Sequence, residues 1–141
     1  MKKSLILIVT LILIAVVIVT VKINDIQKGK KQVLKYNQEF EYYCNRNILG
    51  TEITTLMNKA TDINEKNEIQ KDEKNLYISD DENSVKIYVK MKFTEKIYPM
   101  DSFYIAGIND FTKYFGGINF KSSKIEYHKN GKIASIIFEE Q

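Results

Sequence analysis

Residues 5–21 read LILIVTLILIAVVIVTV, and no charged side chain interrupts this run. Its only polar members are Thr10 and Thr20. As an α-helix the run is about 25 Å long, slightly shorter than the roughly 30 Å hydrocarbon core of a bilayer. Lys22 can extend its ammonium group to the membrane surface and Ile23 lengthens the apolar side. Residues 1–22 are therefore predicted to form a transmembrane anchor.

A secretory signal peptide is the alternative interpretation of this N-terminus, with Lys2 and Lys3 as its charged region. The stretch VVIVTVK at residues 16–22 contains no small-residue cleavage site, and the apolar run is longer than that of an ordinary signal. A lipoprotein signal would also require a cysteine near the end of the run, where the sequence has none. We therefore expect an uncleaved, single-pass anchor in the cell membrane.

The lysines beside the anchor account for the positive charge of the chain. The formal net charge is +3, but Lys2 and Lys3 contribute two positive charges and residues 22–35 contribute four more, so residues 36–141 carry −3. A mildly acidic body argues against nucleic acid as a partner. Lysines at a membrane surface gain about 1 kcal/mol each from anionic lipids, and the bilayer is the first predicted partner. The basic segment consists of Lys22, Lys28, Lys30, Lys31 and Lys35.

Two orientations of the anchor stay open. A very short N-terminal tail that carries two lysines is typical of a signal anchor, which translocates the chain that follows it. The basic segment favours the opposite orientation, because positive charges are retained on the cytoplasmic side. We expect an extracytoplasmic body. The alternative is a cytoplasmic body, tethered by a reverse anchor and held to anionic lipids by the basic segment.

Helical periodicity continues beyond the anchor. Residues 23–48 are predicted to form a juxtamembrane amphipathic helix, because Val33, Tyr36, Phe40, Tyr43 and Cys44 share one helical stripe. The pair Leu49-Gly50 is expected to end this helix, and Thr51 is expected to cap a second helix. The second helix has a buried stripe of its own, which consists of Ile53, Leu56, Met57 and Ala60.

Residues 49–141 are predicted to form a small α+β domain. In VKIYVKMKF, residues 85–93, apolar and polar residues alternate, which indicates a strand with one buried face. Its expected hairpin partner is residues 76–79. A second hairpin joins residues 120–128 and 132–138 through Asn130-Gly131, a dipeptide that suits a tight turn. Between the hairpins, Asp101 is expected to cap a single helix that ends at Gly116-Gly117. We therefore expect an antiparallel sheet of about four strands, covered on one face by helices.

No catalytic, metal or cofactor site is predicted. A single cysteine and a single histidine exclude internal disulfides, multi-cysteine metal sites and histidine-rich ligand sets. Cys44 is expected to pack on the apolar stripe, and His128 to be a solvated or capping residue at a strand end. The acidic turn at residues 80–83 lacks the ligand spacing of a calcium loop. An enzyme would need a concave site that gathers Asp80, Asp81, Glu82 or His128.

One strand face is a candidate surface for protein contacts, because it combines lysines with an aromatic side chain. It consists of Lys86, Tyr88, Lys90 and Lys92. The expected partner is a second copy of the chain or another envelope protein. On this basis we expect a non-enzymatic binding or assembly module.

Two resemblances support this expectation. The run at residues 49–60, LGTEITTLMNKA, together with NEKN at residues 64–67 and Phe120, Ile125, Glu126, Tyr127 and His128, resembles a group of uncharacterised single-span membrane proteins of low-GC Gram-positive bacteria, clostridia especially. The resemblance implies location and fold. The layout of an apolar helix that continues into an amphipathic helix on an antiparallel sheet also resembles type IV pilins and pseudopilins. The N-terminal run lacks the Gly-Phe processing site and the glutamate of those proteins.

Overall fold

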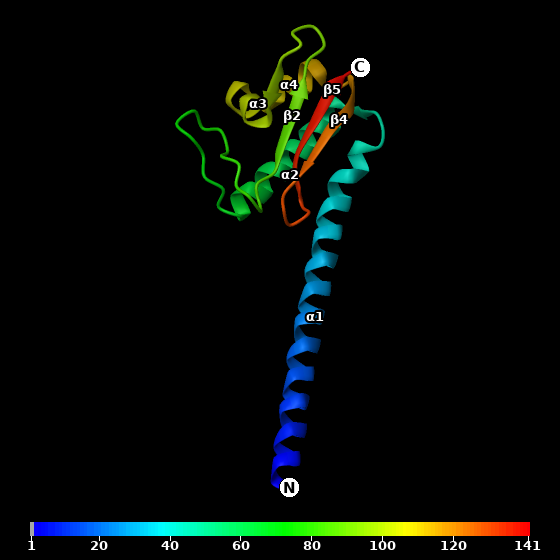
Figure 1. Cartoon of the computed structure of the whole chain (residues 1–141). Coiled ribbons are helices and arrows are strands. Elements are labelled where there is room, and N and C mark those ends of the chain that lie inside the picture. Colours follow the sequence, from blue (N-terminus) through cyan, green and yellow to red (C-terminus); the bar gives the residue numbers. More distant parts are fainter. Residues whose placement is uncertain (1) are drawn as a thin grey trace. The chain divides into compact units, whose positions relative to one another are not determined.

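The protein is described here from a computed structural model, which covers residues 2–141 (Figure 1). The chain divides into two units, one that ends at Lys35 and one that spans Tyr36–Gln141. Helix α1 (Lys2–Cys44) belongs to both units, because it runs through the boundary between them.

The first unit contains the apolar part of α1 and the lysine-rich turns that follow it. Within the described residues, α1 is the one helix that is long and apolar enough to span a membrane. Its apolar side chains from Leu11 to Val21 are exposed. The hydroxyl groups of Thr10 and Thr20 donate to the carbonyls of Ile6 and Val17, at 2.6 and 2.9 Å. Both hydroxyls are thus satisfied inside the helix, as a hydrocarbon environment requires.

The second unit is an α+β domain built on one five-stranded sheet. The spatial order of the strands is β1-β4-β5-β2-β3. All neighbouring pairs are antiparallel except β2 and β5, which are parallel. The α+β prediction is confirmed, with five strands instead of about four and with one parallel pair. The strands are β1 (Ile48–Leu49), β2 (Lys86–Lys90), β3 (Ile97–Pro99), β4 (Asn119–Tyr127) and β5 (Ile133–Glu140).

Helices cover one face of this sheet, as predicted, and α2 lies across it in Figure 1. They are α2 (Gly50–Lys66), α3 (Met100–Ala106), α4 (Ile108–Phe115) and the last turns of α1. The predicted stripe of α2 is fully buried, and Phe40 and Cys44 of α1 join the same core. On the sheet, Ile87 and Val89 of β2 pair with Ile136 and Phe138 of β5. These four side chains are buried together with Ile48 of β1, Phe120 of β4 and Ile133 of β5.

The predicted partner strand in the first hairpin is wrong. Residues 76–79 form no strand, and β2 instead makes a hairpin with β3, in which Val89 pairs with Tyr98. The strand ends at Lys90, so Phe93 falls in the turn and is 83% exposed instead of continuing the buried alternation. The segment before β2 is held by the side chain of Asp101, which accepts the backbone N–H of Tyr77.

The predicted helix between the hairpins is two helices, because the chain turns at Gly107. This residue has φ +105°, a conformation that L side chains rarely adopt, and it separates α3 from α4. Asp101 lies in the first turn of α3 rather than at its cap, which is Pro99. The predicted end of the second helix is confirmed, since α4 stops at Phe115 and Gly116 follows as its C-cap.

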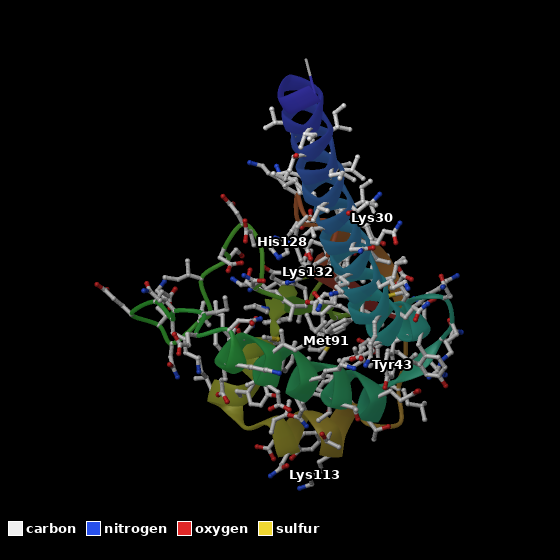
Figure 2. All side chains as sticks on the ribbon, turned by 90° about the horizontal axis from the view of Figure 1, so that it is seen from below. Lys30, Tyr43, Met91, Lys113, His128 and Lys132 are labelled. Carbon is white, nitrogen blue, oxygen red and sulfur yellow. The ribbon has the colours of Figure 1, made fainter. Side chains whose placement is uncertain are left out.

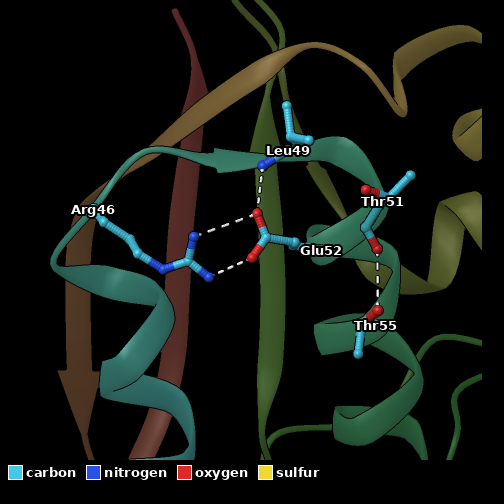
Figure 3. Close-up of polar contacts among 5 residues, drawn as sticks. All are labelled: Arg46, Leu49, Thr51, Glu52 and Thr55. Atoms are coloured by element: carbon cyan, nitrogen blue, oxygen red, sulfur yellow. Dashed lines mark hydrogen bonds and ion pairs between the residues drawn. The ribbon is translucent and has the colours of Figure 1, made fainter.

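The start of α2 also differs from the prediction. Helix α1 ends at Cys44, residues 48–49 form β1, and the cap position of α2 is Leu49 instead of Thr51. Figure 3 shows that the carboxylate of Glu52 accepts the backbone N–H of Leu49 and pairs with Arg46, whereas the hydroxyl of Thr55 donates to the carbonyl of Thr51. The backbone N–H of Leu49 and then Arg46 hold the pKa of Glu52 below its ordinary value. A first-turn acid therefore stabilises this helix start.

The hairpin of β4 and β5 is confirmed. His128 N–H donates to the carbonyl of Lys132 at 2.8 Å, and Gly131 adopts φ +83° in the turn, which only glycine adopts readily. Figure 2 labels His128 and Lys132 at the two ends of this turn. The tight turn brings β5 back beside β4, so that β5 becomes the central strand of the sheet.

Candidate functional site

The predicted contact face lies on one side of strand β2. Lys86, Tyr88 and Lys90 alternate with the buried Ile87 and Val89, so they lie on the face opposite the core helices. Tyr88 pairs in register with Ile137 of β5, which is also only half-buried. The structure therefore brings three of the four predicted residues together with an apolar neighbour. Lys92 lies beyond the end of the strand and is exposed.

Carboxylates from β5 reduce the positive charge of this contact face. Lys90 Nζ lies 3.7 Å from Glu139 Oε1, and the backbone N–H of Lys92 donates to Glu140 at 2.9 Å. Both side chains of the first pair are more than a third exposed, so the pair stabilises the fold little. A partner would meet a mixed-charge surface with Tyr88 and Ile137 at its centre, rather than a purely basic one.

The basic segment lies on exposed turns of α1. All five of its lysines are exposed, and Lys30 is labelled in Figure 2. The helical period places Lys28, Lys31 and Lys35 along one side of α1 and Lys22 and Lys30 on the other. The segment therefore presents positive charge around the helix, with its greater part on one side.

Cys44 is a packing residue in this fold. Its side chain is 6% exposed, and its thiol donates to the carbonyl of Phe40 at 3.4 Å. Burial raises the pKa of the Cys44 thiol to about 11, against the opposing effect of the Ser122 hydroxyl. A protonated, buried thiol is a poor nucleophile.

Hydrogen bonds join the turn that contains His128 to the acidic turn. His128 Nε2 donates to the carbonyl of Ser84 at 2.7 Å, and Lys132 Nζ donates to Asn83 Oδ1 at the same distance. Within the acidic turn, Asp80 Oδ1 accepts the backbone N–H groups of Glu82, Asn83 and Ser84. Burial alone would raise the pKa of Asp80, but these N–H groups outweigh it and hold the pKa below its ordinary value. His128 and Lys132 therefore join the acidic turn to the turn between β4 and β5.

A pocket of about 310 Å³ lies between α2, α3 and the segment before β2, and it was not predicted. Helix α2 contributes Thr61 and Glu65, the segment before β2 contributes Lys71 and Tyr77, and α3 contributes Asp101 and Tyr104. The Tyr77 hydroxyl donates to Glu65 Oε1 at 3.4 Å, and the Tyr104 hydroxyl donates to Asn58 Oδ1 at 2.5 Å. The pocket therefore combines two aromatic rings with two carboxyl groups.

Periodicity along the sequence does not reveal this pocket, because its lining residues come from separate segments of the chain. The sequence predicts a strand at Tyr77 and a helix cap at Asp101, which places the two residues in separate elements. They lie far apart in the chain, and in the folded chain the backbone N–H of Tyr77 donates to Asp101 Oδ1 at 3.3 Å. Among the described residues, no group of three or more histidine, cysteine, aspartate or glutamate side chains could hold a metal ion.

Comparisons with protein-family models, with curated proteins and with solved structures find no match for this chain.

Proposed function

We propose that this protein is a non-enzymatic binding or assembly module of the cell envelope, anchored by one membrane span and pilin-like in layout. The observation that carries the proposal is the continuity of α1, which begins as an exposed apolar helix and ends within the core of the α+β domain. One element thus serves as both anchor and core helix. A body that is built onto its own anchor suits a protein that presents a surface at the membrane.

The environments of the reactive side chains support a non-enzymatic role. The Cys44 thiol is buried and protonated, Asp80 Oδ1 is occupied by three backbone N–H groups, and His128 is bound to a backbone carbonyl. A nucleophile and its base must lie within hydrogen-bond reach of each other, and these groups bond to the backbone instead. The contact face is the surface on which we expect a second copy or another envelope protein to bind.

A photo-cross-linking amino acid in place of Tyr88 tests the contact face in cells that produce the full chain. We expect an adduct with a second copy or with another envelope protein. The matched control carries the same group in place of Thr55, which is exposed on α2 and lies in the helical layer. Identical adducts from both positions, or none from Tyr88, would contradict an interaction through this face.

A cytoplasmic body is the second candidate, and the basic segment is the observation that favours it. Its five exposed lysines suit anionic lipid head groups, which lie on the cytoplasmic leaflet. On this hypothesis a chain that begins at Lys22 binds anionic vesicles in a salt-sensitive manner. Replacement of the five lysines by glutamine would release it, and unchanged binding of that variant would reject the hypothesis.

A further inference from the structure

The pocket between α2 and α3 contains a buried carboxyl group of which only one oxygen accepts a hydrogen bond. Asp101 is 3% exposed, and its Oδ1 accepts the backbone N–H of Tyr77. Its Oδ2 is buried and has no hydrogen-bond partner among the residues that the structure describes. A buried carboxyl oxygen without a partner is costly, and a hydrogen-bond donor placed in the pocket would relieve that cost.

The pocket also has a negative electrostatic environment. Burial and then the carboxylates of Glu65 and Asp101 raise the pKa of Tyr77 to about 12. Burial likewise raises the pKa of Asp101, with Tyr77 N–H, Lys86 and Lys71 among the groups that oppose the rise. Besides burial, the negative charge of the two carboxylates contributes to the raised pKa of Tyr77, whereas the raised pKa of Asp101 reflects its burial. Such a pocket disfavours anions and favours cations.

A cation of the protein itself already lies at this pocket. Lys71 Nζ is 4.4 Å from the centre of the Tyr77 ring, within the range of a cation–π interaction. Lys71 is exposed and extends from the segment before β2, so it can leave the ring without disturbing the core. The position of its ammonium group indicates that the ring and the carboxylates favour a cation.

We propose that this pocket binds the primary ammonium group of a small ligand, which takes the place of Lys71 over the Tyr77 ring. An ammonium group offers three donors, enough to reach Glu65 and the unpartnered oxygen of Asp101. The volume of about 310 Å³ lies at the lower end of ligand pockets and suits an amine of a few heavy atoms or one lysine side chain of a polypeptide. The inference adds a ligand class to the proposed binding role. Only the role of amine binding in the cell rests on that proposed function, and amine binding itself does not.

The test uses the full chain in nanodiscs of zwitterionic lipid, with the backbone amide signals of Tyr77 and Asp101 followed by NMR. The probes are 1,5-diaminopentane and, as its uncharged counterpart, 1,5-pentanediol. We expect the diamine alone to shift both signals, with a dissociation constant on the order of 1 mM for so small a ligand. Equal shifts from the diol, or no shift from the diamine, would overturn the proposal.

Nα-acetyl-lysine amide separates the two sources of the ammonium group. Tighter binding of this compound than of the diamine would identify a polypeptide side chain as the ligand. Tighter binding of the diamine would identify a free amine. Either result supports the pocket.

Variants of the pocket test binding directly, because a purely structural role of these residues would not change the affinity for the diamine in the ways expected here. Lys71→Gln removes the resident cation, so the diamine should bind about threefold more tightly. Glu65→Gln should weaken binding about fivefold, because one of the two carboxylates is lost. Lys74→Gln is the matched control, since it removes an exposed lysine of the same segment and should change affinity less than twofold. Unchanged or weaker binding by Lys71→Gln would contradict a displaced ammonium group.

Because these measurements use isolated protein, they do not depend on the orientation of the body in the membrane. Failure of amine binding would leave the envelope proposal standing, and a cytoplasmic body would leave the pocket standing.

Discussion

At the scale of single residues, two buried asparagines connect helices to the sheet. Asn64 of α2 donates to the carbonyl of Val85 and accepts its N–H, both at 2.8 Å. Asn37 of α1 does the same at the other hairpin, where it donates to the carbonyl of Gly131 and accepts the N–H of Ile133. Each side chain satisfies one backbone donor and one backbone acceptor, as the backbone of a neighbouring strand would.

Asn64→Ala is expected to lower the free energy of unfolding by about 2 to 4 kcal/mol, because it leaves the buried N–H and C=O of Val85 without partners. Denaturant unfolding of the full chain in detergent measures the change. Asn109→Ala, at an exposed position of α4, is the control and should stay within about 0.5 kcal/mol of the parent. Equal stability of the two variants would show that the Asn64 bonds contribute nothing.

The Cys44 thiol is expected to resist alkylation at pH 8 while the protein is folded, and to react once denaturant is added. Burial raises its pKa from 9.0 to about 11 in the fold, so the folded chain retains a proton that the unfolded chain releases. Stability from this group is therefore fully present below pH 9 and is lost as the pH rises toward 11. Rapid labelling of the folded protein at pH 8 would contradict this account.

At the scale of elements, the sequence predicted those that depend on local signals. The stripe of α2, the turn at Asn130-Gly131 and the end of α4 at Gly116 were all correct because neighbouring residues determine them. The predicted hairpin partner of β2 was wrong, because apolar segments lie close to β2 on both sides in the sequence and local signals do not choose between them. Strand β2 pairs with β3 and, through β5, with the C-terminal end of the chain.

The contact between α2 and α4 depends on Gly50. A Cβ atom at this position would lie 2.1 Å from the carbonyl oxygen of Phe115, too close for the backbone of α4 to remain in place. Gly50→Ala should therefore lower the melting temperature by several degrees, equivalent to about 1 to 3 kcal/mol. Gly117→Ala is the matched control, because nothing lies within 4 Å of its added Cβ, and it should melt like the parent. Similar melting of both variants would exclude a close approach at Gly50.

The end of α1 is expected to be a necessary part of the folded body. Phe40 is fully buried and Asn37 holds the turn of the β4–β5 hairpin. A chain that begins at Lys35 should unfold cooperatively on heating, as followed by circular dichroism. A chain that begins at Ile48 loses both residues and should lack that transition, and cooperative unfolding of this shorter chain would contradict the assignment.

At the scale of the whole molecule, the sequence predicted two parts of the chain, a membrane anchor and a folded body. An uncharged apolar run predicted an anchor, and the helical and strand periods of the residues after it predicted an α+β domain. The structure gives that domain five strands, and it describes one apolar helix long enough to cross a membrane. The pocket escaped prediction because Glu65, Tyr77 and Asp101 belong to three separate segments, which only the folded chain brings together.

The side of the membrane that carries the body is the central claim, and one cysteine tests it. Lys129→Cys places a thiol at an exposed position of the turn between β4 and β5, whereas Cys44 in the parent chain is buried and serves as the unlabelled control. Intact cells are treated with a membrane-impermeant maleimide. We predict that Lys129→Cys labels to the same extent in intact and in lysed cells. Protection in intact cells, with labelling only after lysis, would place the body in the cytoplasm and contradict the account.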